Sequence, residues 1–403
     1  MHIEKIAIQN FKALKSVELT DLPPVSVFVG KNGTGKSTLF KVFSFLKTCL
    51  ESDVRQALTK EGGLLGFKEV ITRGASPDEE ICIELKFRME ITGVQRLVTY
   101  ILNIGRQHNK PVVNREILRY KRGESGAPFH FIDFKCGRGE AVNNEEDFNK
   151  PDKDLTRESQ TISEHALAVS SLGQLERFKA AKAFRDLIAN WHISDFHIGD
   201  ARGKKMQESG VHLSSSGDNL PSVAYRLREE ESAVFENILE KMRRRVPGIE
   251  DIEAQVGNDG SLLIRYSDGA FSDPFLDHNV SDGTIKMFAY MVLLHDPMPH
   301  KILCVEEPEN QLYPELMTLL AEEFQSYADR GGQVFISTHS PDFLNPIELE
   351  SLFLIEKQDG VSKILRAADD PLVREQMEAG FKAGQLWNEG IFEGMGERIG
   401  QAS

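Results

Sequence analysis

The sequence has few cysteines and no long apolar run. Its four cysteines, among 403 residues, show neither Cys-x-x-Cys spacing nor a histidine at metal-ligand distance. We therefore expect free thiols in a reducing compartment. No stretch approaches the ~20 apolar residues that a membrane-spanning helix requires, and the alternating N-terminus lacks the apolar core of a signal peptide. These absences predict a cytoplasmic protein with no membrane contact.

Positive charge is also scarce. Lys and Arg number 48 against 62 Asp and Glu, for a formal net charge of -14. A protein that coats nucleic acid by bulk electrostatics needs the opposite balance. One short basic cluster, 241–245, is typical of the solvated end of a helix that begins near Asp218, and local nucleic-acid contact is the alternative. The content of 40% apolar and 27% charged residues is typical of a globular protein with a sizeable core.

A complete phosphate-binding loop lies at residues 30–37, between an apolar run at 25–29 and a helix-compatible segment. Its glycines let successive backbone N–H groups point at phosphates, and the following helix presents its positive end to them. Lys36 is expected to contact the β- and γ-phosphates and Ser37 a Mg²⁺ ion. The predicted nucleotide-binding residues are Gly30, Asn32, Gly33, Thr34, Gly35, Lys36, Ser37 and Thr38.

Periodicity predicts a β-rich start, a helical middle and an α/β second half. The expected strands are 3–9, 15–20, 25–29, 81–87, 97–104, 117–121, 129–134, 262–266, 301–305, 333–337 and 352–356. The expected helices are 38 to about 58, 163–190, 219–245, 282–294 and 314–328. The polar stretches 140–160 and 199–217 are expected to be loops. The strands before 140 suggest an antiparallel sheet, and the later alternation of strands and helices implies a largely parallel one.

This pattern divides the chain into four predicted segments. Residues 1–140 are expected to form the first part of a nucleotide-binding domain, 141–250 a helical lobe, 251–365 the second part of that domain, and 366–403 a tail. Aromatic residues in the tail are expected to dock on the core, and docking on a partner is the alternative.

Three further motifs flank predicted strands and helices. Glu306 and Glu307 end an apolar strand, which suits a Mg²⁺ ligand and a group that acts on an attacking water. His339 follows the next strand, where it can contact a γ-phosphate. Ser281 precedes the helix at 282–294; it is an N-cap candidate, and with Gly283 it also forms a γ-phosphate clamp.

Together, the phosphate-binding loop, Ser-Asp-Gly-Thr at 281–284, Glu-Glu-Pro-Glu-Asn at 306–310 and Thr-His-Ser-Pro at 338–341 resemble the ABC-type ATPases of the RecF/SMC/OLD-like branch. The closest resemblance is to short AAA-type ATPases of the AAA_21 or OLD-like group. It implies an α/β P-loop NTPase fold of ABC type with an N-terminal antiparallel β-subdomain and an inserted helical lobe. It also implies ATP and Mg²⁺ as cofactors, and a homodimer that encloses the nucleotide.

The resemblance assigns a role to each motif. Lys36 holds phosphate, Ser37 and Glu306 organise Mg²⁺, Glu307 positions or deprotonates water, and His339 senses the γ-phosphate. A signature segment made of Ser281, Asp282, Gly283 and Thr284 acts in trans on the partner's ATP. Two positions depart from the pattern, since Glu306 stands where many relatives have Asp and Tyr313 where His is usual. No glutamine loop is assigned, because Gln95, Gln160 and Gln174 lack distinctive context.

The predicted function is an ATP-hydrolysing switch in a DNA-repair or anti-phage defence complex that controls a separate effector such as a nuclease. Nucleic acid is a further candidate partner, and a scaffold or sensor with little turnover is the alternative. A GTPase is disfavoured because its Asn-Lys-x-Asp pattern, at 149–152, sits in the most polar stretch, and a small-molecule kinase needs no signature segment. A TOPRIM nuclease domain is not expected, since Asp369 and Asp370 lack strand context.

Overall fold

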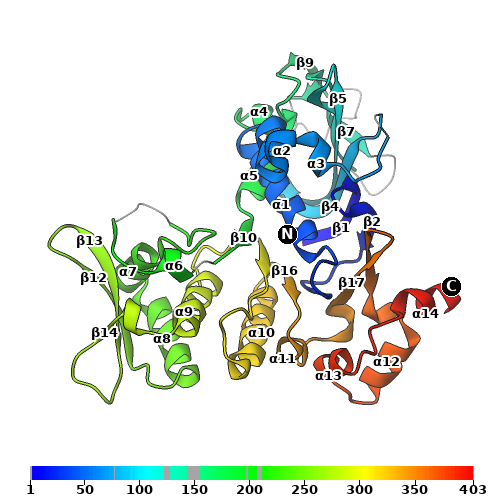
Figure 1. Ribbon diagram of the computed structural model, residues 1–403. Coiled ribbons are helices and arrows are strands. Elements are labelled where there is room, and N and C mark those ends of the chain that lie inside the picture. The colour runs from blue at the N-terminus through cyan, green and yellow to red at the C-terminus, as the bar shows by residue number, and fades with distance from the viewer. Residues whose placement is uncertain are drawn as a thin grey trace.

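The computed structural model describes residues 2–76, 78–91, 93–121, 128–143, 155–196, 198–206 and 211–402. Three sheets organise the molecule (Figure 1). An antiparallel sheet with helices α1 to α5 lies at the top of the view, a small sheet with α7 and α8 at the left, and the C-terminal helices at the right. A mainly parallel sheet runs between them and carries the phosphate-binding loop.

The central sheet has the strand order β10-β15-β16-β3-β17-β18. Its strands are His192–Ser194 (β10), Ile302–Glu306 (β15), Gln333–Thr338 (β16), Val25–Val29 (β3), Leu352–Gln358 (β17) and Val361–Arg366 (β18). All neighbours pair in parallel except β17 and β18. Phe28, Phe335 and Phe353 face one hydrophobic core, whereas Val27, Ile336 and Leu354 face a second. Burial on both faces explains why these strands read as continuous apolar runs.

Two central strands were not predicted. The strand at 352–356 was expected to be the last, yet β18 follows it as an antiparallel hairpin partner. Positive φ at Asp359 and Gly360 makes the tight turn between them. The other, β10, has only three residues and is therefore too short to give a periodic signal.

The antiparallel sheet has the order β2-β1-β4-β5-β6-β7-β8-β9. Its strands are Leu14–Thr20 (β2), His2–Phe11 (β1), Ile81–Ile91 (β4), Val94–Gln107 (β5), Lys110–Tyr120 (β6), Phe129–Lys135 (β7), Arg138–Val142 (β8) and Arg157–Thr161 (β9). The prediction of an antiparallel N-terminal sheet is thus confirmed. The expectation of a loop over 140–160 is wrong at both ends, because residues at its two ends belong to β8 and β9, which pair with each other. Residues 144–154 lie outside the described residues.

Helices cover one face of this sheet. They are Lys36–Glu51 (α1), Val54–Gly62 (α2), Phe67–Val70 (α3), Ala168–Leu172 (α4) and Lys179–Ala189 (α5). The single helix expected from 38 to about 58 is interrupted, because the Asp53 carboxylate accepts the backbone N–H of Gln56 and so starts α2 as its N-cap.

The third sheet consists of Lys205–Met206 (β11), Ser261–Ser267 (β13), Asp251–Val256 (β12) and Phe275–Leu276 (β14). The strand predicted at 262–266 is therefore correct as a strand, but it belongs to an antiparallel hairpin and not to the parallel sheet. Alternate residues Ile252, Ala254, Ile264 and Tyr266 pack into the second core with Leu220–Glu230 (α7) and Ser232–Arg245 (α8).

The helices expected within 141–250 are divided between the two cores. Side chains of α4 and α5 belong to the first core, and those of α7 and α8 to the second. The expected loop at 199–217 contains part of the short helix Ile198–Ala201 (α6) and all of β11, and residues 207–210 lie outside the described residues.

The remaining helices pack on the second core. They are Asp282–Leu294 (α9), Pro314–Asp329 (α10), Pro341–Leu344 (α11), Pro371–Glu378 (α12), Ala383–Asn388 (α13) and Met395–Ala402 (α14). As expected, the tail docks on the core, through buried Leu386, Phe392 and Met395. Asp370 follows a strand after all, but its buried carboxylate caps α12 and binds Arg398 at 2.7 Å. No helix among the described residues is long and apolar enough to cross a bilayer.

Glu116 supplies a test of the first core. Its side chain is fully buried on β6, where it accepts hydrogen bonds from the backbone N–H groups of Ala168 and Val169 and from the Tyr100 hydroxyl. Burial raises the pKa of the Glu116 carboxyl from 4.5 to about 7. The unfolded chain therefore loses this proton at lower pH than the folded protein does, and the free energy of unfolding should fall by up to roughly 3 kcal/mol as pH rises through this window.

Glu116→Gln removes this titration. Urea unfolding at pH 5, 6, 7 and 8 should show that wild type loses stability relative to the variant as pH rises. Glu90→Gln, at an exposed position of β4, is the matched control and should track wild type at every pH. A constant difference between wild type and Glu116→Gln across the series would contradict the prediction.

Candidate nucleotide site

The phosphate-binding loop joins β3 to α1. Gly33 and Gly35 have φ of +81° and +110°, a region that favours glycine. Gly35 is the N-cap of α1, and no side chain caps the helix. The first N–H groups of a 16-residue helix therefore lack a side-chain acceptor and point out of the helix end, as anion binding requires.

The β17–β18 hairpin holds this loop from behind. The Ser362 hydroxyl donates to the Thr34 carbonyl at 2.6 Å. A Cβ on Gly35 would lie 2.2 Å from that hydroxyl oxygen, and a Cβ on Gly30 would lie 2.4 Å from the Ile355 carbonyl oxygen. Packing against the hairpin therefore demands glycine at 30 and 35, in addition to any requirement from phosphate.

Lys36 lies inside the loop. Its side chain is only 5% exposed, and its ammonium donates to the Gly30 carbonyl at 2.7 Å and lies 3.9 Å from Glu307 Oε1. Burial lowers the pKa of Lys36, although the carboxylates of Glu307, Glu309 and Glu306 oppose the shift. The Lys36 ammonium thus lies between the phosphate-binding loop and the Glu307 carboxylate, the predicted catalytic group.

Glu306 and Glu307 occupy the end of β15. The Glu306 carboxylate bonds to the Ser37 hydroxyl, and burial raises its pKa because no cation fully offsets the lost hydration. Glu307 has φ of +43°, and its backbone N–H donates to the Ser337 carbonyl at 2.9 Å. Asn310 Nδ2 donates to Glu307 Oε2 at 3.1 Å. The positive φ is a strained conformation of the kind that clusters at functional sites, and it fixes the direction of this carboxylate.

A third carboxylate, Glu309, orients His339. Glu309 Oε1 accepts the Thr338 hydroxyl at 2.7 Å and the His339 backbone N–H at 2.8 Å, and lies 3.2 Å from His339 Nδ1. His339 Nδ1 is also 3.7 Å from Glu307 Oε1. Sequence reasoning assigned Glu309 no role, although its place in the Glu-Glu-Pro-Glu segment was a signal.

The signature segment lies at the start of α9. The Ser281 hydroxyl accepts the Thr284 backbone N–H at 3.2 Å, so the N-cap reading agrees with the structure. Ser281 and Asp282 are exposed, and a Cβ on Gly283 would lie 2.9 Å from the Gln311 carbonyl oxygen. Lys286, one turn later, donates to the Asn310 carbonyl at 2.7 Å, and burial lowers its pKa to about 8. The segment therefore contacts the loop after Glu307 from within the same chain.

Asp195 was missed by sequence reasoning. It directly follows β10, whose Ser194 pairs with Val305 of β15, and it lines a pocket of about 360 Å³ together with Glu306. The Asp195 charge contributes to the raised pKa of Glu306. The three glutamines considered for this region lie on β5, on β9 and just after α4 instead. The position of Asp195 beside Glu306 follows from the pairing of β10 with β15 and not from a sequence motif.

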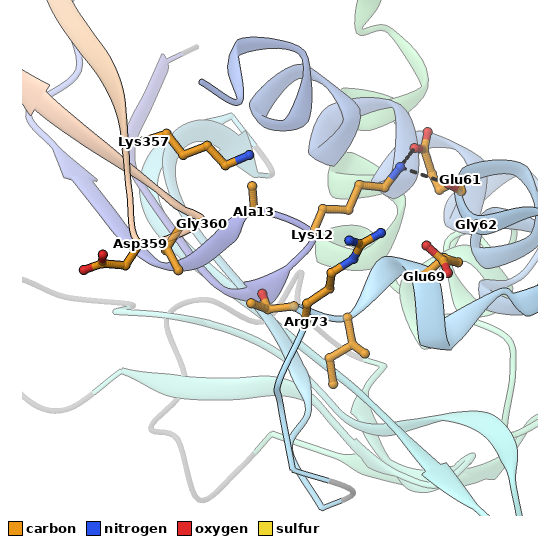
Figure 2. Close-up of a pocket in the computed structure, with 12 residues that line it drawn as sticks. Lys12, Ala13, Glu61, Gly62, Glu69, Arg73, Lys357, Asp359 and Gly360 are labelled. Atoms are coloured by element: carbon orange, nitrogen blue, oxygen red, sulfur yellow. Dashed lines mark hydrogen bonds and ion pairs between the residues drawn. The ribbon is translucent and has the colours of Figure 1, made fainter. Parts of the chain in front are cut away.

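A larger pocket of about 700 Å³ adjoins the loop (Figure 2). Its lining comes from the β1–β2 turn, the β17–β18 turn, the end of α2, and α3 with the segment that follows it. Figure 2 shows the side chains of Lys12, Arg73 and Lys357 extending into it. Lys12 pairs with Glu61 at 2.8 Å. The Ser362 backbone N–H donates to the carbonyl of Ala13, a lining residue of this pocket, at 2.8 Å. Ser362 therefore contacts both the phosphate-binding loop and the lining of the pocket.

The basic cluster at 241–245 is engaged with acidic partners. Lys241 and Arg245 bind the buried Glu323 carboxylate at 2.7 and 2.8 Å. Arg243 binds Glu236, and Arg244 binds Glu240. The cluster therefore serves packing and helix-surface pairing, and nucleic-acid contact there stays without structural support.

Residues 25–345 match the family model described as "AAA domain, putative AbiEii toxin, Type IV TA system". The chain belongs to this family. It is also similar to the DNA replication and repair protein RecF of Listeria innocua, at 26% identity over 151 residues, which are 35% of this chain and 39% of that protein. RecF of Lactobacillus acidophilus is 30% identical over 92 residues, 23% of this chain and 24% of that one. This chain therefore spans at most about two fifths of the length of these RecF relatives.

Solved structures match over nearly the whole chain. An SMC head bound to the C-winged helix domain of ScpA aligns with TM-score 0.53 and 14% identity, covering 91% of this chain and 97% of that one. The SMC head with an extended coiled coil from Pyrococcus furiosus, bound to the C-terminal domain of ScpA, gives TM-score 0.53 and 12% identity, covering 94% and 99%. The predicted fold, a P-loop NTPase of ABC type, is confirmed, as is membership of the RecF/SMC branch of ABC-type ATPases.

Gly35 and Gly33 form a matched pair for testing the loop. Both have positive φ, but a Cβ on Gly33 meets no atom within 4 Å, whereas one on Gly35 strikes Ser362. Gly35→Ala should lower the free energy of unfolding by more than Gly33→Ala, whose cost is backbone strain alone, about 1–3 kcal/mol. Urea unfolding and binding of a fluorescent ATP analogue measure the two effects. Equal losses in both variants would show that the hairpin does not constrain the loop.

Proposed function

We propose that this protein binds ATP with Mg²⁺, hydrolyses it, and dimerises around the nucleotide as a switch. The observation that carries the proposal is the convergence of Lys36, Glu307 and His339 at the uncapped start of α1. A bound triphosphate would receive the loop N–H groups and the Lys36 ammonium. The match to a P-loop ATPase family supports nucleotide binding as such.

The residues near Ser37 fit a magnesium ion. A hydroxyl and carboxylates supply the oxygen ligands that Mg²⁺ prefers, and the raised pKa of Glu306 marks a buried carboxylate that a cation would stabilise. Among the described residues, no three His, Cys, Asp or Glu side chains are placed to share a metal. This suits Mg²⁺, which keeps waters and takes phosphate oxygens as ligands. When bound, the ion neutralises charge that develops on the phosphates.

Glu307 is proposed to act on the attacking water. Asn310 and the positive φ fix its carboxylate, and Lys36 lies 3.9 Å away on the phosphate side. The carboxylate would orient the water and accept its proton as the water oxygen bonds to the γ-phosphorus and the bond from that phosphorus to the β–γ bridging oxygen breaks, which leaves ADP and phosphate. His339, held through Glu309, is proposed to contact the γ-phosphate and so report whether it is present.

The 700 Å³ pocket is proposed to take the nucleoside end of the ligand. It adjoins the loop through Ser362 and carries the cations Lys12, Arg73 and Lys357. The choice of ATP over GTP follows from the family resemblance, since the guanine-reading pattern at 149–152 lies outside the described residues.

A homodimer is proposed because the first two residues of the signature segment face solvent, although Gly283 and Thr284 are buried. Ser281 and Asp282 are exposed, as is Tyr313 at 61% in the loop after Glu307. An exposed helix start suits the γ-phosphate of a nucleotide held by a second copy, and the Ser281 hydroxyl, which now caps α9 through Thr284, lies at that start. ATP would then join two copies, and hydrolysis would release them.

The biological role is proposed from the relatives. RecF is named for DNA replication and repair, and the family description refers to a toxin of a toxin–antitoxin system. For this chain we infer a cytoplasmic switch in a DNA-repair or anti-phage defence complex, acting on a separate effector such as a nuclease, with nucleic acid as a further partner. The alternative is an ATP-dependent scaffold or sensor that hydrolyses little.

Glu307→Gln separates these roles. Loss of a general base typically slows the chemical step by 10²–10⁴-fold, so phosphate release should fall by about that range while ATP binding persists. Size-exclusion chromatography with ATP and Mg²⁺ should then show a stable dimer for the variant and a transient one for wild type.

The control is Glu315→Gln, which removes the same charge at an exposed position at the start of α10 and should behave as wild type. Equal, negligible turnover in wild type and Glu307→Gln would favour the scaffold. Absence of any ATP-dependent dimer in Glu307→Gln would overturn the dimer proposal.

A further inference from the structure

A ten-residue segment, 195–204, connects the metal side of the site to the signature segment. It begins at Asp195, beside Glu306 in the 360 Å³ pocket. Phe196 packs against Tyr290 of α9, with ring centroids 5.0 Å apart. Arg202 and Gly203 follow α6, within the stretch that was predicted to be a loop.

Arg202 forms hydrogen bonds to the stretch that precedes α9. Its guanidinium donates to the backbone carbonyls of Asp277 and Val280, the latter at 2.9 Å, and to the Asp282 carboxylate. The next residue, Gly203, donates its backbone N–H to the Asp277 carboxylate at 2.5 Å. A planar guanidinium presents several donors in fixed directions, so it can hold three acceptors in one arrangement, which an ammonium cannot do equally well.

This contact is more than a surface ion pair. The Arg202 side chain is 22% exposed, so water competes little for its two hydrogen bonds to backbone carbonyls, whereas the Asp282 carboxylate is 48% exposed. Two of the acceptors are backbone carbonyls on the approach to Ser281, and the third belongs to the residue after it. The position and direction of the Ser281 hydroxyl therefore depend on Arg202.

We propose that Arg202 is a positioning residue that sets the signature segment for the ATP held by a second copy of this chain. The inference rests on the proposed function, because it requires the signature segment to act in trans. Arg202 itself touches no nucleotide. Its effect is expected on the partner's site, while its own chain's phosphate-binding loop stays competent.

Arg202→Ala should lower ATP turnover by at least about tenfold, the loss typical of removing charge-assisted hydrogen bonds at an active site. Binding of a fluorescent ATP analogue to the variant should stay within about twofold of wild type, since Lys36 and its loop are untouched. Arg202→Lys should regain part of the turnover. Lys204→Ala, two residues on, is the matched control: the Lys204 ammonium binds the exposed Asp259 at 3.4 Å, and its removal should leave turnover unchanged.

Mixed dimers locate the effect. Lys36→Ala disables a chain's own loop, so a mixed dimer of Lys36→Ala with Arg202→Ala keeps one intact composite site, formed by the loop of the Arg202→Ala chain and the signature segment of the other. Mixing the two variants should therefore give turnover above the sum of each alone. The double variant Lys36→Ala/Arg202→Ala mixed with Lys36→Ala should gain nothing. Restored turnover also shows that the Arg202→Ala chain folds.

A second mixture separates this inference from the proposal on which it rests. Lys36→Ala mixed with Ser281→Arg tests the trans arrangement alone. If that pair regains turnover and the Arg202→Ala pair does not, Arg202 serves its own chain and the positioning role is overturned. If neither pair regains turnover, the signature segment does not act in trans, and both proposals fail. Wild-type turnover in Arg202→Ala would overturn the positioning role by itself.

Discussion

The parallel pairing of β3 with β16 is the constraint on which the rest of the site depends. In its register Thr338 lies opposite Val29, while the next ladder sets Glu306 opposite Ser337. The strands therefore end together at one edge of the sheet, where Gly30, His339 and Glu307 are the next residues of three separate chain segments. Parallel sheets collect ligand-binding loops at their carboxyl ends for this reason. A shift of this ladder by one residue would turn the alternating core residues to the opposite faces and separate Lys36 from Glu307.

Charge of both signs is concentrated at this edge of the sheet. Glu306, Glu307, Glu309 and Asp195 approach the site, and the protein's own compensation comes from the partly buried ammonium groups of Lys36 and Lys286. Buried charges are costly unless they are paired and hydrogen-bonded. Burial raises the pKa of Glu306 and lowers the pKa of Lys36 and of Lys286, and these opposite shifts reflect that cost. The proposed metal–triphosphate complex would supply charge of both signs to these groups.

Much of the site could be predicted because its motifs are local in sequence. The loop at 30–37, the carboxylates after β15 and His339 after β16 each follow an apolar run, and parallel strands bring such ends together. What the sequence did not reveal depends on pairing between distant segments. Asp195 follows a three-residue strand, β13 was assigned to the wrong sheet, and β18 was overlooked although it holds the phosphate-binding loop. The contacts of Arg202 span about 80 residues, so composition alone made that segment look like a free loop.

The contact between Ser362 and Thr34 has a consequence for biosynthesis. The phosphate-binding loop is made early in translation, yet the strands on both sides of β3 and the hydroxyl that supports the loop belong to residues more than 300 positions later. Until those residues leave the ribosome, both edges of β3 are unpaired and the loop lacks its contact with Ser362. Such long-range pairing slows folding and leaves apolar strands exposed in the nascent chain. The phosphate-binding loop is therefore supported from behind only after Ser362 has been made, 328 residues after Thr34.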